Sequence, residues 1–134
     1  MPLLQFDYAG AELTPLQAQA IQRDLTALMA EVLHKAGPLT VVAVRQQCAA
    51  QWSVGGGALQ SGTWTASLVA YITAGTNSEA EVALFIERAN QQIREVLGEP
   101  VTPLYVVVCG VDARHWGYDG RTQLARRVAA APGT

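Results

Sequence analysis

The chain repeats one pattern, in which an extended apolar segment is followed by a helix with a marked start and stop and then by a second extended segment. The first copy covers residues 1–47 and the second covers residues 62–110, at an offset of about sixty residues. Two strands joined by a crossover helix pair in parallel within one sheet. The repeat therefore restricts the chain to a sheet built from two βαβ units.

The first unit is delimited by residues that start and stop helices. Leu3–Tyr8 is expected to form a strand, and Thr14 caps a predicted helix over Pro15–Lys35. Gly37-Pro38 ends that helix, and the valine-rich stretch Leu39–Gln46 is the predicted second strand. The apolar face expected on the helix comprises Leu16, Ile21, Leu25, Leu28, Met29 and Val32. His34 is interpreted as a residue of the helix end.

The second unit restarts the same order. Thr63–Ile72 alternates in polarity as a half-buried strand does, and Ser78 with Glu81 predicts a capping box that opens a helix over Ser78–Leu97. Leu104–Cys109 is the predicted last strand. The face of Thr63–Ile72 expected to be buried comprises Trp64, Ala66, Leu68, Ala70 and Ile72. Both units thus predict the same local structure from different residues.

The predicted fold is a single α+β domain over residues 1–134, with a four-stranded mixed sheet and both helices on one of its faces. The connection 47–62 contains Gly55-Gly56-Gly57, which predicts a flexible turn or a hairpin end. Residues 111–134 form a C-terminal segment, with a short helical turn expected over Thr122–Ala130 and a loose end at Ala131–Thr134. Val41-Val42 and Val106-Val107 place apolar bulk on both sides of their strands, so the uncovered face is expected to pack against other subunits.

Composition and charge exclude several classes of function. Only 15% of the residues are charged and the net charge is −2, which offers no electrostatic footprint for nucleic acid and no basic run for a membrane surface. Neither a secretory leader nor an apolar run of the ~18 residues that a membrane span needs is present in the sequence. Cys48 and Cys109 are far apart and lack metal-ligand spacing. They are expected to be reduced structural thiols, in a cytoplasmic protein without a metal site.

The start of the chain carries the one candidate for chemistry that follows from the residues alone. A small residue after the initiator methionine favours removal of that methionine, and Pro2 would then begin the chain with a free secondary amine. Burial lowers the pKa of such an amine towards neutrality because the charged form loses solvation. The alternative is that Met1-Pro2 is a chance opening of a strand.

Taken together, these features resemble the tautomerase superfamily, which is built from paired βαβ units with an amino-terminal proline as catalytic base. The matching features are Met1-Pro2-Leu3, the two units and the tail motif Trp116-Gly117-Tyr118. Leu39–Arg45 and Tyr71–Gly75 are most similar to 5-carboxymethyl-2-hydroxymuconate isomerase. The resemblance implies a homotrimer, no metal, no organic cofactor and keto–enol isomerisation of small 2-oxo or 2-hydroxydienoate acids.

One departure from the resemblance separates its branches. The tail is more similar to the decarboxylase and dehalogenase branches, yet these carry arginines just after the third strand. Here that stretch reads Thr73-Ala74-Gly75-Thr76-Asn77, which favours simple isomerisation.

Arg45 is the expected clamp for a substrate carboxylate, because it stands in a valine-rich strand and matches an arginine of the isomerase. The alternative is an arginine that reaches into solvent at a strand end. If the first two strands are parallel, Arg45 lies at the opposite end from Pro2 and reaches a Pro2 only across a subunit boundary. If the two units are antiparallel, the tail of the same subunit lies near Pro2. Arg114, His115 and Tyr118 are then candidate donors to an enolate oxygen and Trp116 an apolar wall, with a structural role as the alternative for each.

Three functions remain open at this point. The first is an isomerase that uses Pro2 as general base. The second is a decarboxylase, hydratase or dehalogenase on the same scaffold, with the protonated proline as acid. The third is a non-enzymatic trimeric protein that binds a small acid or another protein. For the two enzymes the expected ligand is a small carboxylate substrate.

Overall fold

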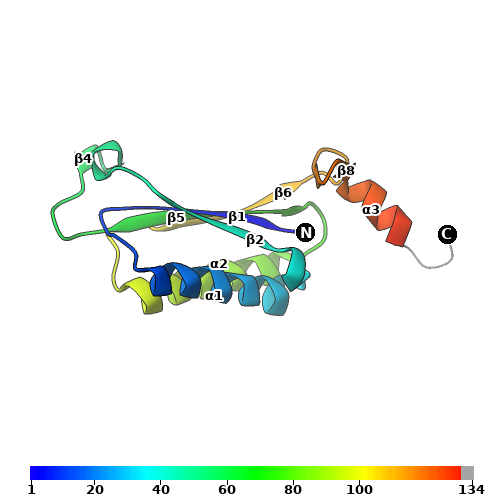
Figure 1. Cartoon of the computed structure of the whole chain (residues 1–134), viewed down its shortest axis with the longest axis horizontal. Coiled ribbons are helices and arrows are strands. Elements are labelled where there is room, and N and C mark those ends of the chain that lie inside the picture. The colour runs from blue at the N-terminus through cyan, green and yellow to red at the C-terminus, as the bar shows by residue number, and fades with distance from the viewer. Residues whose placement is uncertain (131–134) are drawn as a thin grey trace.

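The computed structural model describes residues 1–130, so the expectation for Ala131–Thr134 lies outside the described residues. A sheet lies over two antiparallel helices, and a third helix extends beyond one end of the sheet (Figure 1). The main elements are β1 (Leu3–Ala9), α1 (Pro15–Leu33), β2 (Val41–Gln46), β5 (Thr65–Thr73), α2 (Glu79–Leu97) and β6 (Tyr105–Val111).

The four long strands form one mixed sheet in the order β2-β1-β5-β6. β1 pairs parallel with β2, β5 pairs parallel with β6, and the two units meet where β1 runs antiparallel to β5. Leu3 therefore lies opposite Val41 on one side and Tyr71 on the other. This is the predicted α+β fold of two βαβ units, with both helices on one face of the sheet (Figure 1).

A short hairpin follows the last strand of each unit, and the two hairpins lie at opposite ends of the sheet (Figure 1). Their two-residue loops, Gly55-Gly56 and Asp119-Gly120, have positive φ at both positions, as tight hairpin turns require. The remaining elements are η1 (Gly37–Leu39), η2 (Ala49–Gln51), β3 (Ser53–Val54), β4 (Gly57–Ala58), β7 (Gly117–Tyr118), β8 (Arg121–Thr122) and α3 (Gln123–Ala130). The triple glycine thus belongs to a hairpin, and the tail forms a hairpin and a helix.

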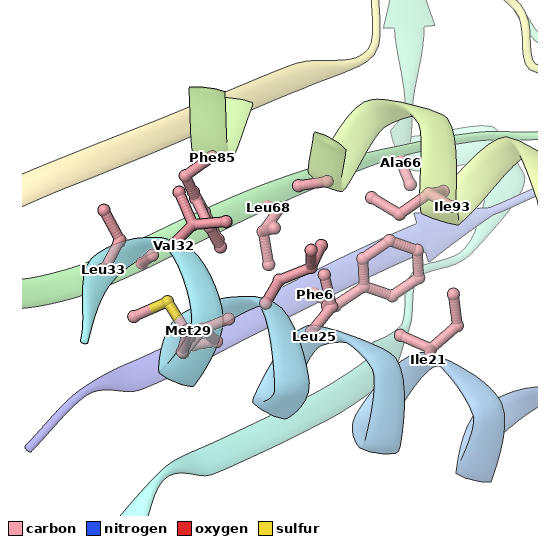
Figure 2. Packing of buried hydrophobic residues seen from close by; sticks show 14 of the residues in the cluster. Phe6, Ile21, Leu25, Met29, Val32, Leu33, Ala66, Leu68, Phe85 and Ile93 are labelled. Carbon is pink, nitrogen blue, oxygen red and sulfur yellow. The ribbon is translucent and has the colours of Figure 1, made fainter. Parts of the chain in front are cut away.

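The core lies between the sheet and the two helices (Figure 2). Phe6 of β1 and Phe85 of α2 are fully buried. All five residues predicted to face inward from 64 to 72 are buried. The expectation for Leu16 is wrong, because it is 77% exposed, whereas the rest of the predicted face of α1 is buried. Leu16 lies in the first turn of α1, where helical spacing does not imply burial.

Both long helices begin with a capping box. Thr14 Oγ1 accepts from Gln17 N at 3.1 Å, and Ser78 Oγ accepts from Glu81 N at 3.1 Å. α1 ends at Leu33, two residues before the predicted end, because His34 turns into the left-handed region with φ of 58°. His34 Nε2 also lies 3.0 Å from a Glu81 carboxylate oxygen, which links the end of α1 to the start of α2.

The face of the sheet opposite the helices is not covered by residues 1–130. Val106 and Val108 pack against the core, so the alternate residues of β6 face the other way. Two of these alternate residues are exposed, Tyr105 at 64% and Val107 at 43%. Val41 on β2 is also exposed, at 54%. Within residues 1–130 no helix is both long and apolar enough to cross a membrane.

Candidate active site

Pro2 lies at the start of β1, at the floor of a cavity of about 370 Å³. Its ring is buried, and its carbonyl oxygen accepts from Val41 N at 3.2 Å. The cavity is enclosed by the start of the chain, by the η1–β2 junction at residues 38–41 and by residues 116–119 of the tail, with Gln123 at its edge. A rigid, parallel strand pair thus fixes the position of Pro2 beside the tail.

The tail reaches Pro2 because the two units are antiparallel, which brings the ends of β5 and β6 to the start of β1. Trp116 Nε1 donates to Thr73 Oγ1 at 3.2 Å, and Gln123 N donates to the Trp116 carbonyl oxygen at 2.9 Å. A side chain at Gly117 would collide with the Arg121 carbonyl of the facing strand, so the β7–β8 hairpin needs glycine there. These contacts hold Trp116 and Tyr118 in the wall of the cavity.

α3 packs its first residues against the start of the chain. Gln123 is 8% exposed, and its Nε2 donates to the Met1 carbonyl oxygen at 3.4 Å. The Arg126 guanidinium lies 3.7 Å from the centre of the Tyr118 ring and donates to the Tyr118 carbonyl oxygen at 3.1 Å. α3 therefore contacts both the tail hairpin and Met1, and it holds the hairpin next to the start of the chain.

The amino terminus is in surroundings that favour a neutral amine. Burial, and secondly the positive charge of Lys35, lower the pKa of the Met1 amino group below its ordinary value of 8.0. Pro2 is one residue further inward and is buried more deeply than Met1. Burial would therefore also disfavour a charged amine at the position of Pro2.

The predicted site residues divide into three groups. Trp116 and Tyr118 line the cavity of Pro2. Arg114 and His115 are exposed and line an adjacent cavity of about 400 Å³, formed by residues 114–122, which shares residues 116–119 with the cavity of Pro2. Arg114 is bound to its neighbour: Nη2 donates to Asp112 Oδ2 at 2.7 Å and Nε to Oδ1 at 3.0 Å. This pair holds the pKa of the Asp112 carboxyl well below its usual range.

Arg45 forms the third group, at the far end of the sheet. It lies opposite Asp7, five residues along β1 from Pro2 and about 16 Å away at the rise of a strand. Its Nη2 donates to Asp7 Oδ2 at 2.9 Å, and Gln47 Nε2 donates to Asp7 Oδ1 at 3.0 Å. The hydrogen bond to Asp7 raises the pKa of Arg45. Arg45 is thus remote from Pro2 of its own chain, as the strand directions predict.

Sequence reasoning missed Lys35, Gln123 and Arg126 as neighbours of the amino terminus. Asp119-Gly120 is a strong two-residue hairpin signal, and it could have predicted that the tail turns back here. The contacts of Arg126 span only eight residues, but their geometry depends on that turn. In residues 1–130 no three His, Cys, Asp or Glu side chains are placed to share a metal ion.

Comparison with solved structures identifies the fold. A wild-type fused 4-OT, a symmetric trimer, aligns over 92% of this chain and 98% of its own with a TM-score of 0.79 and 20% identity. Pt0534 inactivated by 2-oxo-3-pentynoate aligns over 92% and 98% with a TM-score of 0.82 and 12% identity. A macrophage migration inhibitory factor-like protein from Entamoeba histolytica aligns over 90% and 97%, with a TM-score of 0.74 and 16% identity.

The chain therefore has the fold of 4-OT and of the macrophage migration inhibitory factor-like proteins. Identities of this size establish the fold alone. No protein-family model and no curated protein matches the sequence.

Proposed function

We propose that this protein is a cofactor-independent tautomerase, with the amine of Pro2 as general base once Met1 has been removed. The proposed substrate is a small unsaturated 2-oxo or 2-hydroxy acid, similar to 5-carboxymethyl-2-hydroxymuconate. The observation that carries the proposal is the position of Pro2, which starts a buried strand and opens into a cavity walled by Trp116 and Tyr118.

In the proposed reaction, the neutral Pro2 nitrogen takes the proton of the 2-hydroxyl group of an enol acid. The electron pair of the O–H bond becomes the new C=O bond, and the pair of the C2=C3 bond takes the proton back at C3. A nitrogen with a pKa near neutrality suits both transfers. The Tyr118 hydroxyl is the proposed donor to the enolate oxygen, and Trp116 provides an apolar wall. Arg114 and His115 are given no role in this proposed reaction, because they do not line the cavity of Pro2.

The proposed assembly is a homotrimer in which the uncovered sheet faces pack together. The exposed apolar side chains on that face support association. The fused 4-OT that shares the fold is a trimer. An assembly of this kind allows Arg45 of one copy to approach Pro2 of another. Arg45 uses one of its five donors on Asp7 and has others left for a substrate carboxylate.

One of the solved structures with the same fold also supports a 2-oxo acid as the substrate. Pt0534 is inactivated by 2-oxo-3-pentynoate, which is itself a 2-oxo acid, and its fold aligns with this chain at a TM-score of 0.82. Decarboxylation, hydration or dehalogenation would use the same cavity with a protonated proline. No contact of the described residues favours them over isomerisation.

The test combines intact mass with an assay of phenylenolpyruvate and 2-hydroxymuconate. Protein that lacks Met1 should convert the enol acid to its keto form, and Pro2→Ala should lower kcat/KM by about 100-fold or more. Arg45→Ala is tested on the dicarboxylate 2-hydroxymuconate, for which a raised KM is expected. A processed protein without activity, or a Pro2→Ala variant as fast as the wild type, would show that Pro2 is not the base.

A further inference from the structure

A third cavity, of about 250 Å³, also has Met1 among its lining residues. The end of α1, the turn after β5 and the helix α3 enclose it. Its lining side chains include Lys35, Thr73, Thr76, Gln123, Arg126 and Arg127. Three of them are cationic and none is acidic. Met1 and Gln123 line both cavities, so these two residues separate this cationic pocket from the cavity of Pro2.

Arg126 has an unused donor in this region. Its Nη2 is bound to the Tyr118 carbonyl and its plane lies over the Tyr118 ring. Its Nε is buried and has no hydrogen-bond partner. In the part of the chain from 1 to 130, no ion pair joins Arg126 or Arg127 to an acid. A buried donor on a charged group is costly to leave unsatisfied, so Arg126 can gain from an acceptor that residues 1–130 do not supply.

Lys35 adds positive charge to the same pocket. Its Nζ donates to Thr76 Oγ1 at 2.8 Å. Burial is the first cause that lowers the pKa of Lys35, the charge of Glu81 opposes it and the charge of Arg127 adds to it. Glu81 is the acid within range, and it lies against His34. Its carboxylate therefore does not occupy the space between Lys35 and Arg126.

We infer that the cationic pocket receives the carboxylate of the substrate, with Arg126 as its principal ligand. This inference rests on the proposed function and deepens it. Removal of Met1 takes away one of the two residues between the cavities and leaves the Pro2 nitrogen next to the cationic pocket. A 2-oxo or 2-hydroxy acid then sits with its carboxylate towards Arg126 and its organic chain towards Trp116 and Tyr118. Both carboxylate and base come from the same copy of the chain.

Arg126 and Arg45 would then bind different carboxylates of a substrate. A monocarboxylate such as phenylenolpyruvate depends on Arg126 and not on Arg45. Arg45 of a neighbouring copy is left for the second carboxylate of a longer dicarboxylate. The substrate class favoured by the structure is therefore an acid whose first carboxylate adjoins the reacting carbons.

Binding is tested without turnover, with 3-phenylpropanoate as the charged probe and 3-phenylpropanamide as the matched uncharged one. Titration calorimetry on protein lacking Met1 should show that the acid binds more tightly than the amide. Arg126→Gln should weaken the acid by about 10- to 100-fold and leave the amide unchanged. Arg126→Lys should recover part of the loss, and the exposed Arg88→Gln on α2 is the control that should change neither.

A second measurement uses the unaltered protein. The Arg126 Nε–H resonance, assigned through its absence in Arg126→Lys, should shift on addition of the acid and stay in place with the amide. The inference is overturned if the wild type does not prefer the acid, if Arg126→Gln binds it as the wild type does, or if the Nε–H resonance does not respond. Pro2→Ala should bind the acid normally, so loss of the base and loss of the carboxylate site give different results.

Discussion

The two βαβ units use the same frame, and they differ at the start of their first strands. In the first unit Val41 N donates to the Pro2 carbonyl at 3.2 Å, and in the second Val101 N donates to the Trp64 carbonyl at 2.7 Å. Each start lies near the hairpin that follows the last strand of the other unit. Yet Pro2 is next to the end of the chain, whereas Trp64 is preceded by an ordinary peptide bond. The same architecture can therefore offer a free amine in one unit only.

The hairpin segments differ in charge as well. Residues 47–63 contain no Asp, Glu, Lys or Arg. The corresponding segment after β6 carries four arginines (114, 121, 126 and 127) against two aspartates (112 and 119), and the end of α1 adds Lys35 beside it. Positive charge and a potential base thus coincide at one end of the sheet. The fold thus places a hairpin segment beside the first strand of each unit, and the charges of that segment decide which of the two places can bind an acid.

The largest expected effect comes from moving the chain end away from Pro2, because the position of the chain end is what distinguishes the first unit from the second. An alanine inserted between Met1 and Pro2 makes the Pro2 nitrogen a tertiary amide that cannot take a proton. We expect kcat/KM for phenylenolpyruvate to fall by about 100-fold or more, with the melting temperature little changed. Trp64→Phe is the matched change at the other start, and its activity should stay at the wild-type level. Activity within a few-fold of wild type in the insertion variant would contradict a catalytic amine.

The shared helix starts provide the next comparison. Thr14→Ala and Ser78→Ala each remove one capping box and should each lower the free energy of unfolding by about 1 kcal/mol. Urea unfolding measures both, with Gln19→Ala, exposed on α1, as the control. If only one of the two substitutions destabilises the protein, the units do not depend on their caps in the same way.

The tryptophans near the two hairpins are expected to differ in function. Trp116→Phe keeps an aromatic ring but loses the hydrogen bond to Thr73, which ties the tail to β5. A neutral hydrogen bond of this kind contributes about 1 kcal/mol, so kcat/KM should fall by about two- to tenfold. Trp52→Phe, near the uncharged hairpin, should have no effect on the assay. Equal losses in the two variants would point to a general effect on stability, which thermal melts would reveal.

The smallest expected effect concerns pH. A base must be neutral to act, so kcat/KM should rise with pH through the pKa of the Pro2 amine and then level off. Burial and the charge of Lys35 lower the pKa of the Met1 amine, and if they act on a free Pro2 amine in the same way, the rise moves to lower pH. Lys35→Gln removes one of these causes, raises the pKa and should move the profile to higher pH. A shift to lower pH, or none, would show that Lys35 does not act on the base.

Much of the fold could be predicted from the sequence, because its signals are local. Helix starts at Thr14 and Ser78 and the alternation through Trp64 to Ile72 depend on neighbours within a few residues. The opposed directions of the units also predicted that the tail meets Pro2 and that Arg45 does not. The contact of Arg45 with Asp7 spans 38 residues and depends on register, which no local signal specifies. Arg126 and its unpaired Nε became visible only with the hairpin in place. The catalytic and binding roles of the named residues stay predictions.

Pro2 and Arg45 lie at opposite ends of one strand pair, and this has a consequence for mixtures of defective proteins. If a site for a dicarboxylate takes its base from one copy and its arginine from the next, Pro2→Ala and Arg45→Ala are defects in different halves of a shared site. Co-assembly of the two variants would pair an intact Pro2 with an intact Arg45 at some boundaries. Two inactive preparations, unfolded together and refolded as hybrids, would then complement each other and regain a fraction of the wild-type turnover.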